Sequence, residues 1–82
     1  MDTSAPTLDD YLEGLDHLAH SFDEAAAEAD TLDDEERLYH QAATIRAARR
    51  RAKLLKDDLL AESFYDTALG ILKKHHEARR TR

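Results

Sequence analysis

The sequence predicts an all-α fold, either an antiparallel helical hairpin or a three-helix bundle, with coiled-coil-like packing. Three observations support this prediction. Apolar residues recur at alternating steps of three and four, which is the spacing of a heptad seam. The 82 residues include fourteen Ala but only two Gly and one Pro, so few residues interrupt helices. Charge is also segregated, because every Lys and Arg lies at or after Arg37 and the first 36 residues hold thirteen of the eighteen acids.

Length and composition limit the classes of protein to which the chain can belong. A chain of 82 residues makes one small domain, residues 1–82, and a domain of this size buries only about 60–65% of its unfolded surface. We therefore expect close helix packing, self-association or a partner to contribute to its stability. The absence of Cys excludes a disulfide framework and thiol chemistry. No apolar run approaches the roughly 18 residues of a membrane span, so we expect no membrane contact and a cytoplasmic location.

The first helix is expected over residues 7–30. Thr7 can cap its N-terminus, and Asp9 and Asp10 lie in the first turn, where the helix dipole favours acids. The apolar seam that follows consists of Leu8, Tyr11, Leu15, Leu18, Phe22, Ala25 and Ala29. A set of flanking residues widens the seam to three positions in seven, as in a helix of a bundle: Leu12, Ala19 and Ala26.

The second helix is expected over residues 32–56. Thr31 is followed by Asp33 and Asp34, which repeats the capping pattern of the first helix, so the two helices should be joined by a tight turn near Asp30 and Thr31. The seam of this helix consists of Leu38, Ala42, Ile45, Ala48, Ala52 and Leu55. Its Ala content lets a neighbouring helix approach closely.

Residues 58–79 form either a third helix or a continuation of the second. Acids at Asp57 and Asp58 are followed by bases near the far end, which is the charge order that a separate helix favours. The apolar phase also changes after Lys56. No Gly, Pro or Asn supplies a turn there, however, so both arrangements stay open.

Residues 46–56 contain the one basic cluster of the sequence. In an antiparallel hairpin that turns near Thr31, residues equally distant from the turn lie opposite one another. The expected pairs are Arg46 with Asp16, Arg49 with Glu13, and Arg51 and Lys53 with Asp9 and Asp10, and Arg50 belongs to the same pairing cluster. Each exposed pair contributes only about 0–1 kcal/mol, so their role would be to set register and orientation. The alternative is that this basic helix follows nucleic-acid phosphates, although the net charge of −6 is opposite to that of most nucleic-acid-binding domains.

The sequence supports neither a metal site nor an enzyme. The five His include His17 with His20 on the first helix and the adjacent pair His75 and His76. The chain lacks the Glu-x-x-His pattern of di-iron bundles, so we expect no metal and no cofactor. It also lacks a Gly-rich phosphate loop and a nucleophile elbow, so we expect no catalytic residues.

The apolar residues after Lys56 exceed what two helices can bury. The candidate interface residues are Leu59, Leu60, Phe64, Tyr65, Leu69 and Leu72. Phe64 and Tyr65 are adjacent, so both cannot face one core. We therefore expect contact with a protein partner or self-association into a homodimer or higher oligomer.

These features predict a non-enzymatic helical protein–protein interaction module that serves in oligomerisation, as an adaptor, or as a small co-chaperone or regulatory subunit. The alternative is a nucleic-acid-associated protein that uses the basic helix of residues 46–56. In size, helix order, acidity and lack of Cys, the chain is similar to the two-helix co-chaperones of type III secretion needle subunits. No sequence motif carries that similarity.

Overall fold

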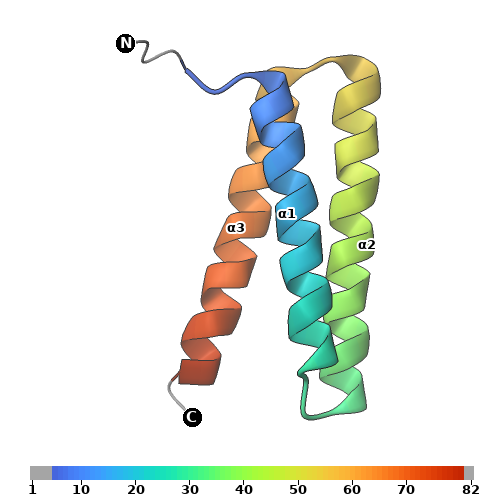
Figure 1. Ribbon diagram of the computed structural model, residues 1–82, viewed down its shortest axis with the longest axis vertical. Coiled ribbons are helices and arrows are strands. Elements are labelled where there is room, and N and C mark those ends of the chain that lie inside the picture. The colour runs from blue at the N-terminus through green and yellow to red at the C-terminus, as the bar shows by residue number, and fades with distance from the viewer. Residues whose placement is uncertain (1–4, 81–82) are drawn as a thin grey trace.

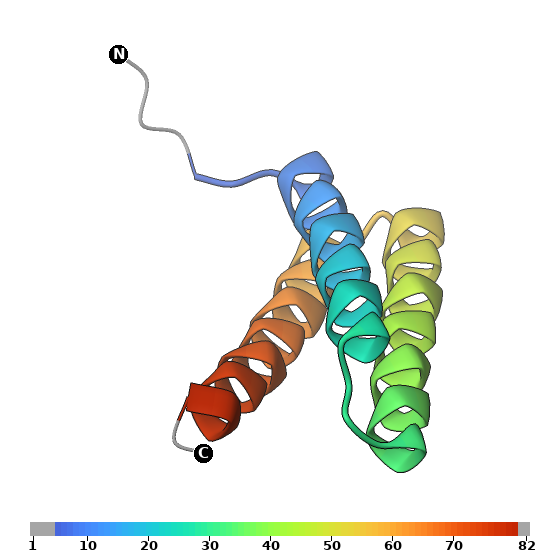
Figure 2. The same cartoon turned by 60° about the horizontal axis from the view of Figure 1, so that its bottom comes forward.

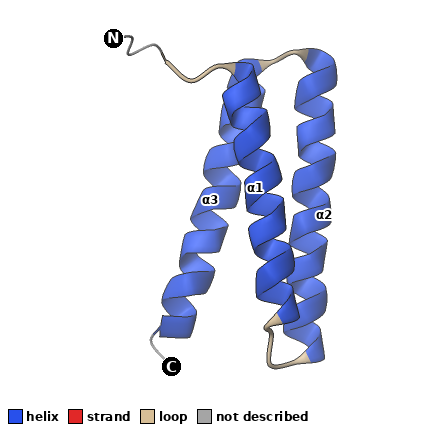
Figure 3. Ribbon diagram, viewed as in Figure 1, coloured by secondary structure: helices blue, strands red, loops and turns tan. Residues whose placement is uncertain are grey.

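A computed structural model describes residues 5–80 of the chain, and these residues form three helices and no strand. The helices are α1 (Leu8–Ala27), α2 (Leu32–Leu55) and α3 (Asp58–Arg80), shown in Figures 1 and 3. The prediction of an all-α fold is confirmed. Of the two arrangements that the sequence left open, the structure has the three-helix bundle, in which α2 runs antiparallel to both α1 and α3 (Figure 1).

The N-termini of α1 and α2 are capped as the sequence predicts. The backbone N–H of Thr7 donates to Oδ2 of Asp10 at 2.9 Å, and the N–H of Asp10 donates to Oγ1 of Thr7 at 3.4 Å, which together make a capping box. Thr31 accepts a hydrogen bond from the N–H of Asp34 at 3.1 Å. The first helix ends at Ala27, earlier than the expected bound of residue 30, so the connection to α2 is a short loop rather than a single turn residue.

The junction between α2 and α3 is a helix stop made without glycine. Lys56 adopts the left-handed conformation, with φ 51° and ψ 42°. Its N–H donates to the carbonyl of Lys53, and the N–H of Asp57 donates to the carbonyl of Ala52, both at 3.3 Å, which is the hydrogen-bond pattern of a Schellman motif. Asp57 then caps α3, because its Oδ1 accepts from the N–H of Leu60 at 3.1 Å.

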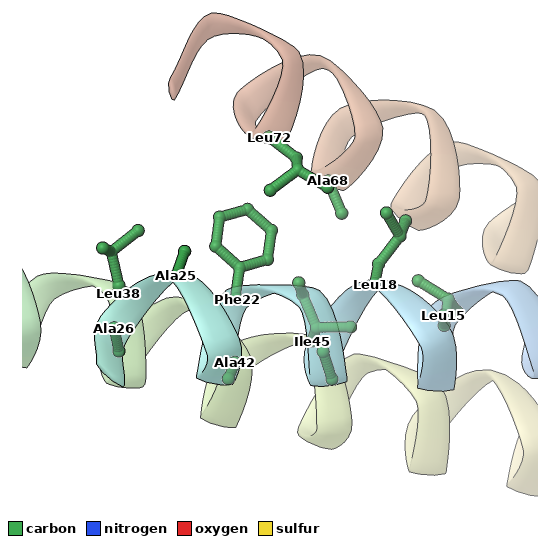
Figure 4. Close-up of a cluster of buried hydrophobic side chains, with 11 residues drawn as sticks. Leu15, Leu18, Phe22, Ala25, Ala26, Leu38, Ala42, Ile45, Ala68 and Leu72 are labelled. Atoms are coloured by element: carbon green, nitrogen blue, oxygen red, sulfur yellow. The ribbon is translucent and has the colours of Figure 1, made fainter. Parts of the chain in front are cut away.

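The hydrophobic core is built around α1 (Figure 4). Phe22 is fully buried, and its ring extends from α1 toward Ala68 and Leu72 of α3 (Figure 4). The main cluster consists of Leu15, Leu18, Ala19, Phe22, Ala25, Ala26, Leu38, Ala42, Ile45, Ala68 and Leu72. A smaller cluster near the N-terminus of α1 consists of Leu12, Ala52 and Ala61. All three helices therefore share one core, and α1 contributes most of it.

Two positions differ from the seams expected from the sequence. Leu12 was expected at the flank, but it is only 5% exposed, because α3 covers the second side of α1 and buries that flank. Leu55 was expected in the seam of α2, but it is 58% exposed. The chain leaves the helix at Lys56, immediately after Leu55, so the seam of α2 ends at Ala52.

Gly14 of α1 lies directly beneath a side chain of α3. A Cβ atom at this position would lie 2.6 Å from Cε1 of Tyr65, which is closer than real side chains approach. The ring of Tyr65 also lies 5.9 Å from that of Tyr11, measured between centroids. Gly14 therefore makes room on α1 for the Tyr65 ring, although it lies off the apolar seam.

The third helix leans away from the other two toward its C-terminus. Figures 1 and 2 show α1 and α2 side by side along their length, whereas α3 crosses near α1 at its own N-terminal end and diverges from there. The contact between α2 and α3 is the smallest of the three helix pairs. The space between α2 and α3 is therefore the least completely packed part of the bundle.

Substitutions in the core are expected to separate buried from exposed leucines. Leu15→Ala, Ile45→Ala and Leu12→Ala should each lower the free energy of unfolding by about 2–4 kcal/mol, because each removes a buried side chain. Leu59→Ala, at a 74% exposed position, should change it by less than about 0.5 kcal/mol. Urea unfolding followed by circular dichroism measures these losses. Equal losses at buried and exposed positions would contradict the packing described here.

The two glycines should respond in opposite ways to the same substitution. Gly70→Ala is expected to raise the free energy of unfolding by about 0.5–1 kcal/mol, because a Cβ there meets no atom within 4 Å and Ala is the better helix former. Gly14→Ala should lack this gain or destabilise the protein, because the Tyr65 ring must move. The same unfolding measurement compares the two variants. An equal gain in both would show that Tyr65 does not rest on Gly14.

Candidate functional site

A groove runs between α2 and α3 on the side away from the outer face of α1. Leu15 and Phe22 of α1 lie beneath it and are fully buried, and its walls are formed by the two later helices. The middle part has a volume of about 300 Å³, and the wide end, where α3 leans away, has a volume of about 340 Å³. Gln41 and Ile71 line both parts, so the two volumes form one continuous groove.

The middle of the groove carries no charge. Its ten lining residues are Leu15, Gln41, Thr44, Ile45, Ala48, Ser63, Phe64, Thr67, Ala68 and Ile71. Charged residues make up 37% of the whole sequence, so an uncharged strip of this length differs from the rest of the surface. Apolar atoms form the deeper part, and the Thr, Ser and Gln side chains form the edges. Uncharged, partly apolar grooves between helices are typical sites for a second helix to dock.

Three exposed leucines lie at the narrow end of this groove, around the junction of α2 and α3. Leu54 is 82% exposed, Leu55 is 58% exposed and Leu59 is 74% exposed. Leu55 lies two helical turns beyond Ala48 on the same face of α2, and Leu59 lies one turn before Ser63 on α3. Arg51 is exposed between Ala48 and Leu55 on α2, so these leucines form a separate apolar patch at this end of the bundle.

The structure divides the interface residues predicted from the sequence into three groups. Leu59 lies on the surface, as an interface residue should. Leu72 is buried in the main core, where it packs inside the chain instead of facing a partner. Phe64, Tyr65 and Leu69 are partly buried against that core, and Leu60 is also half-buried. Most of the apolar surface that suggested a partner is therefore covered within the chain, where α3 packs against the other two helices.

The adjacent residues Phe64 and Tyr65 point in two different directions, and both pack within one chain. Phe64 packs against both core clusters and lines the groove on the α2 side. Tyr65 points to the other side, where it covers Gly14 of α1 and lies beside Tyr11. Neither ring needs a second chain for its burial, but Phe64 remains accessible from the groove.

Sequence analysis missed most residues of the groove, because no motif marks them. The local signal is the absence of charge over residues 41–45 and 67–72, which are uncharged runs in a highly charged chain. The seam predicted for α2 includes Ala42 and Ile45 of the first run, and the partner interface predicted from the sequence includes Leu69 and Leu72 of the second run. Which helices they would lie between depends on how α3 is placed, and the sequence left that open.

The basic cluster of α2 faces α1 in part, but with partners other than those expected. Nη2 of Arg46 donates to Oδ2 of Asp23 at 2.6 Å, so the partner is Asp23 and not Asp16. This hydrogen bond raises the pKa of Arg46, while partial desolvation acts in the opposite direction. Nε of Arg49 donates to the backbone carbonyl of Leu12 at 2.9 Å instead of pairing with Glu13. The long side chain of Arg46 reaches along α1, which is why the pairing differs from the residues that lie directly opposite.

The remaining bases do not form one continuous face. Arg50, Arg51 and Lys53 are exposed, and successive residues of a helix point about 100° apart. Arg46 and Arg49 are half-buried and already donate to α1. The outward side of α1 itself carries acids and, within residues 8–27, no Lys or Arg.

At the wide end of the groove, His75 is held in an unfavourable environment for a positive charge. Its Nε2 atom is buried and has no hydrogen-bond partner in the structure. Desolvation lowers the pKa of His75, and the nearby His76, Arg79 and Arg37 lower it further, whereas Asp34 acts in the opposite direction. The imidazole is therefore expected to stay neutral at pH 7 and to contribute a largely apolar surface to the groove.

Within residues 5–80, no group of three or more His, Asp or Glu side chains is placed to hold a metal ion. None of the described helices has an apolar stretch long enough to span a bilayer. Comparisons of the chain with protein families, with curated proteins and with solved structures found no match.

A double-mutant cycle can test the ion pair between α1 and α2. The coupling energy between Asp23→Ala and Arg46→Ala is expected to be about 0.5–1 kcal/mol, because both side chains are partly exposed. This energy should decrease between about 0.05 and 0.5 M salt, because salt screens the two charges and the Debye length is about 10 Å at 0.1 M. Urea unfolding of the four proteins measures it. The same cycle with Asp16→Ala should give a smaller coupling. A larger coupling with Asp16 would overturn the pairing described here.

Proposed function

We propose that the chain is a non-enzymatic helical protein–protein interaction module whose binding surface is the groove between α2 and α3. The observation that supports this proposal most is the uncharged lining of the groove, since its seven solvent-accessible residues carry no charge in a protein whose sequence is 37% charged. The exposed leucines around the junction of α2 and α3 add a second apolar patch beyond one end of the groove. The occupant is either a second copy of the chain or another protein.

The composition of the groove suits a surface that is alternately free and occupied. Thr44, Ser63 and Thr67 are exposed and can bind water when the groove is empty. Their methyl or methylene groups, with Ala48 and Ile71, can contact an apolar side chain when it is filled. A fully apolar groove would bind more tightly but would also favour aggregation of the free protein.

The nucleic-acid alternative receives less support from the positions of the basic residues. Two of the five bases between Arg46 and Lys53 are turned toward α1. The others point in several directions from a chain of net charge −6, so they do not present a phosphate-binding surface separate from the acids.

The role of a small co-chaperone is the most specific form of the proposal. The similarity that suggested it was to two-helix proteins, whereas this chain has a third helix that packs on α1 and covers much of its apolar face. The general role of an adaptor or oligomerisation module does not depend on that similarity.

The proposal is tested by placing charge in the groove without disturbing the fold. The variant Thr44→Glu with Thr67→Glu puts one carboxylate on each wall, at exposed positions. The matched control, Ala43→Glu with Ala47→Glu, adds the same charge at exposed positions of α2 outside the groove. Sedimentation equilibrium measures self-association, and co-purification from source cells measures binding of other proteins.

We expect the native chain and the control to associate with a second copy or to retain a partner protein, and we expect the groove variant to lose this association. Circular dichroism should show the same helicity for all three proteins. If the groove variant associates as strongly as the native chain, the groove is not the binding surface. If the native chain remains monomeric at about 100 μM, well above the Kd of a stable dimer, and retains no partner, the interaction module itself is refuted.

A further inference from the structure

The two halves of α3 are held to the bundle unequally. In the N-terminal half, Ala68 is buried and the ring of Tyr65 rests on Gly14 of α1. In the C-terminal half, residues 69–80, only Leu72 is buried. Figures 1 and 2 show this half diverging from α1 and α2, and a cavity of about 340 Å³ lies at the same end. Little apolar packing therefore holds the C-terminal half of α3 in place.

His75 lies on this half and faces the cavity wall. Its Nε2 atom is buried and has no hydrogen-bond partner. A neutral imidazole can leave Nε2 as an unprotonated acceptor, whereas an imidazolium carries an N–H on both ring nitrogens. A buried N–H without an acceptor costs free energy. His75 therefore fits its place in the folded chain as the neutral form.

The charged groups around His75 are of both signs. They come from three elements: Glu28 and Asp30 from the loop after α1, Asp34 and Arg37 from α2, and Lys74, His76 and Arg79 from α3. Three of these groups are acids and three are permanently charged bases, so they do not sum to a negative charge that would favour an imidazolium. Two of the acids also pair with arginines, since Asp34 lies 3.0 Å from Arg37 and Glu28 lies 3.7 Å from Arg79.

These surroundings lower the pKa of His75. Burial is the largest cause, the positive charges of His76, Arg79 and Arg37 act in the same direction, and Asp34 acts in the opposite direction. The unfolded chain keeps the ordinary value of about 6.5, so it binds more protons than the folded chain as the pH falls through that value. Acid therefore removes stability from the folded arrangement, and the loss is complete once the pH is below the lowered pKa.

From the buried imidazole, the cavity beside it and the sparse packing around it, we infer that the C-terminal half of α3 is an acid-sensitive arm. When His75 is protonated, the arm detaches from α2 and from the loop after α1, while the N-terminal half of α3 stays anchored at Gly14. Detachment hydrates the imidazolium and uncovers Phe22 and Leu38, which line the same cavity. The wide end of the groove is then open at acidic pH and closed at neutral pH.

Amide hydrogen exchange of the full chain, followed by NMR at about pH 7.5 and about pH 5.5, locates the opening. The lower pH leaves exposed carboxylates ionised, so it titrates His and not Asp or Glu. After correction for the intrinsic effect of pH on exchange, we expect protection of residues 70–77 to fall at least about threefold more than protection of α1 and α2. An equal fall in all three helices would mean that acid weakens the whole fold, and unchanged protection would mean that there is no arm. Either result overturns the inference.

His75→Gln and His76→Gln are a matched pair of variants. Each replaces one imidazole of α3 by an uncharged polar side chain that does not titrate, and His76 is exposed. We expect His75→Gln to lose at least about half of the acid-induced fall in protection, and His76→Gln to keep the response of the native chain. Equal responses in the two variants would show that His75 does not control the arm.

An NMR titration of the native chain tests the same point without any substitution. The Cε1 proton of His75 should titrate with a pKa below the ordinary value of about 6.5. A pKa at or above that value would show that the folded chain accepts the imidazolium, for example because Asp34 turns from Arg37 toward His75, and the inference would then fail. None of these measurements requires a partner, so the acid-sensitive arm and the function proposed above stand or fall separately.

Discussion

The apolar stripe of α1 is the feature on which the rest of the structure depends, because it is wide enough to pack against two helices at once. The stripe is buried in one cluster with residues of α2 and α3, and Phe22 points toward Ala68 and Leu72 of α3 (Figure 4). A strict two-in-seven seam would have held one neighbour and left the third helix without a place to dock. The additional buried positions on α1 therefore change a hairpin into a bundle.

Glycine and alanine decide how closely the helices approach. The α2 seam presents Ala42 and Ala52, both fully buried, so α1 and α2 can pack side by side. On the other side, Gly14 accepts the ring of Tyr65, which anchors α3 near its N-terminal half. Farther along α3, Ala68 and Leu72 pack in the same cluster as Phe22 and Ala25 of α1.

Charge contributes less than apolar packing to the stability of the bundle. Arg46 pairs with Asp23 of α1, and Arg79 pairs with Glu28 at the end of α1; both pairs are partly or largely exposed, and such pairs contribute little stability in water. Each pair joins an acid at or after α1 to a base of a later helix, so their effect is to help set how the helices are aligned.

The sequence by itself determined the helical class, the two threonine caps and most of the buried positions. These features depend on local geometry: a Thr side chain reaches its own first turn, and a spacing of three and four residues places side chains on one face. The same local rules also explain which sequence predictions were wrong. The stop at Lys56 uses a residue that is not favoured in the left-handed conformation, so no turn signal marks it, and Leu55 was assigned to a seam that had already ended.

Only the tertiary structure decided which side of α1 the third helix covers, and therefore which candidate interface residues are buried and which are exposed. Leu72 and Tyr65 pack inside the bundle and Leu59 is exposed, because α3 is rotated so that one of its faces meets α1. That rotation is set by contacts between residues about 50 positions apart, such as Gly14 with Tyr65. The groove is likewise a property of two walls and a floor that come from three separate helices. A pattern read along one helix can show which face is uncharged, but it cannot show that this face lines a groove, because the neighbour that completes the groove is chosen by packing.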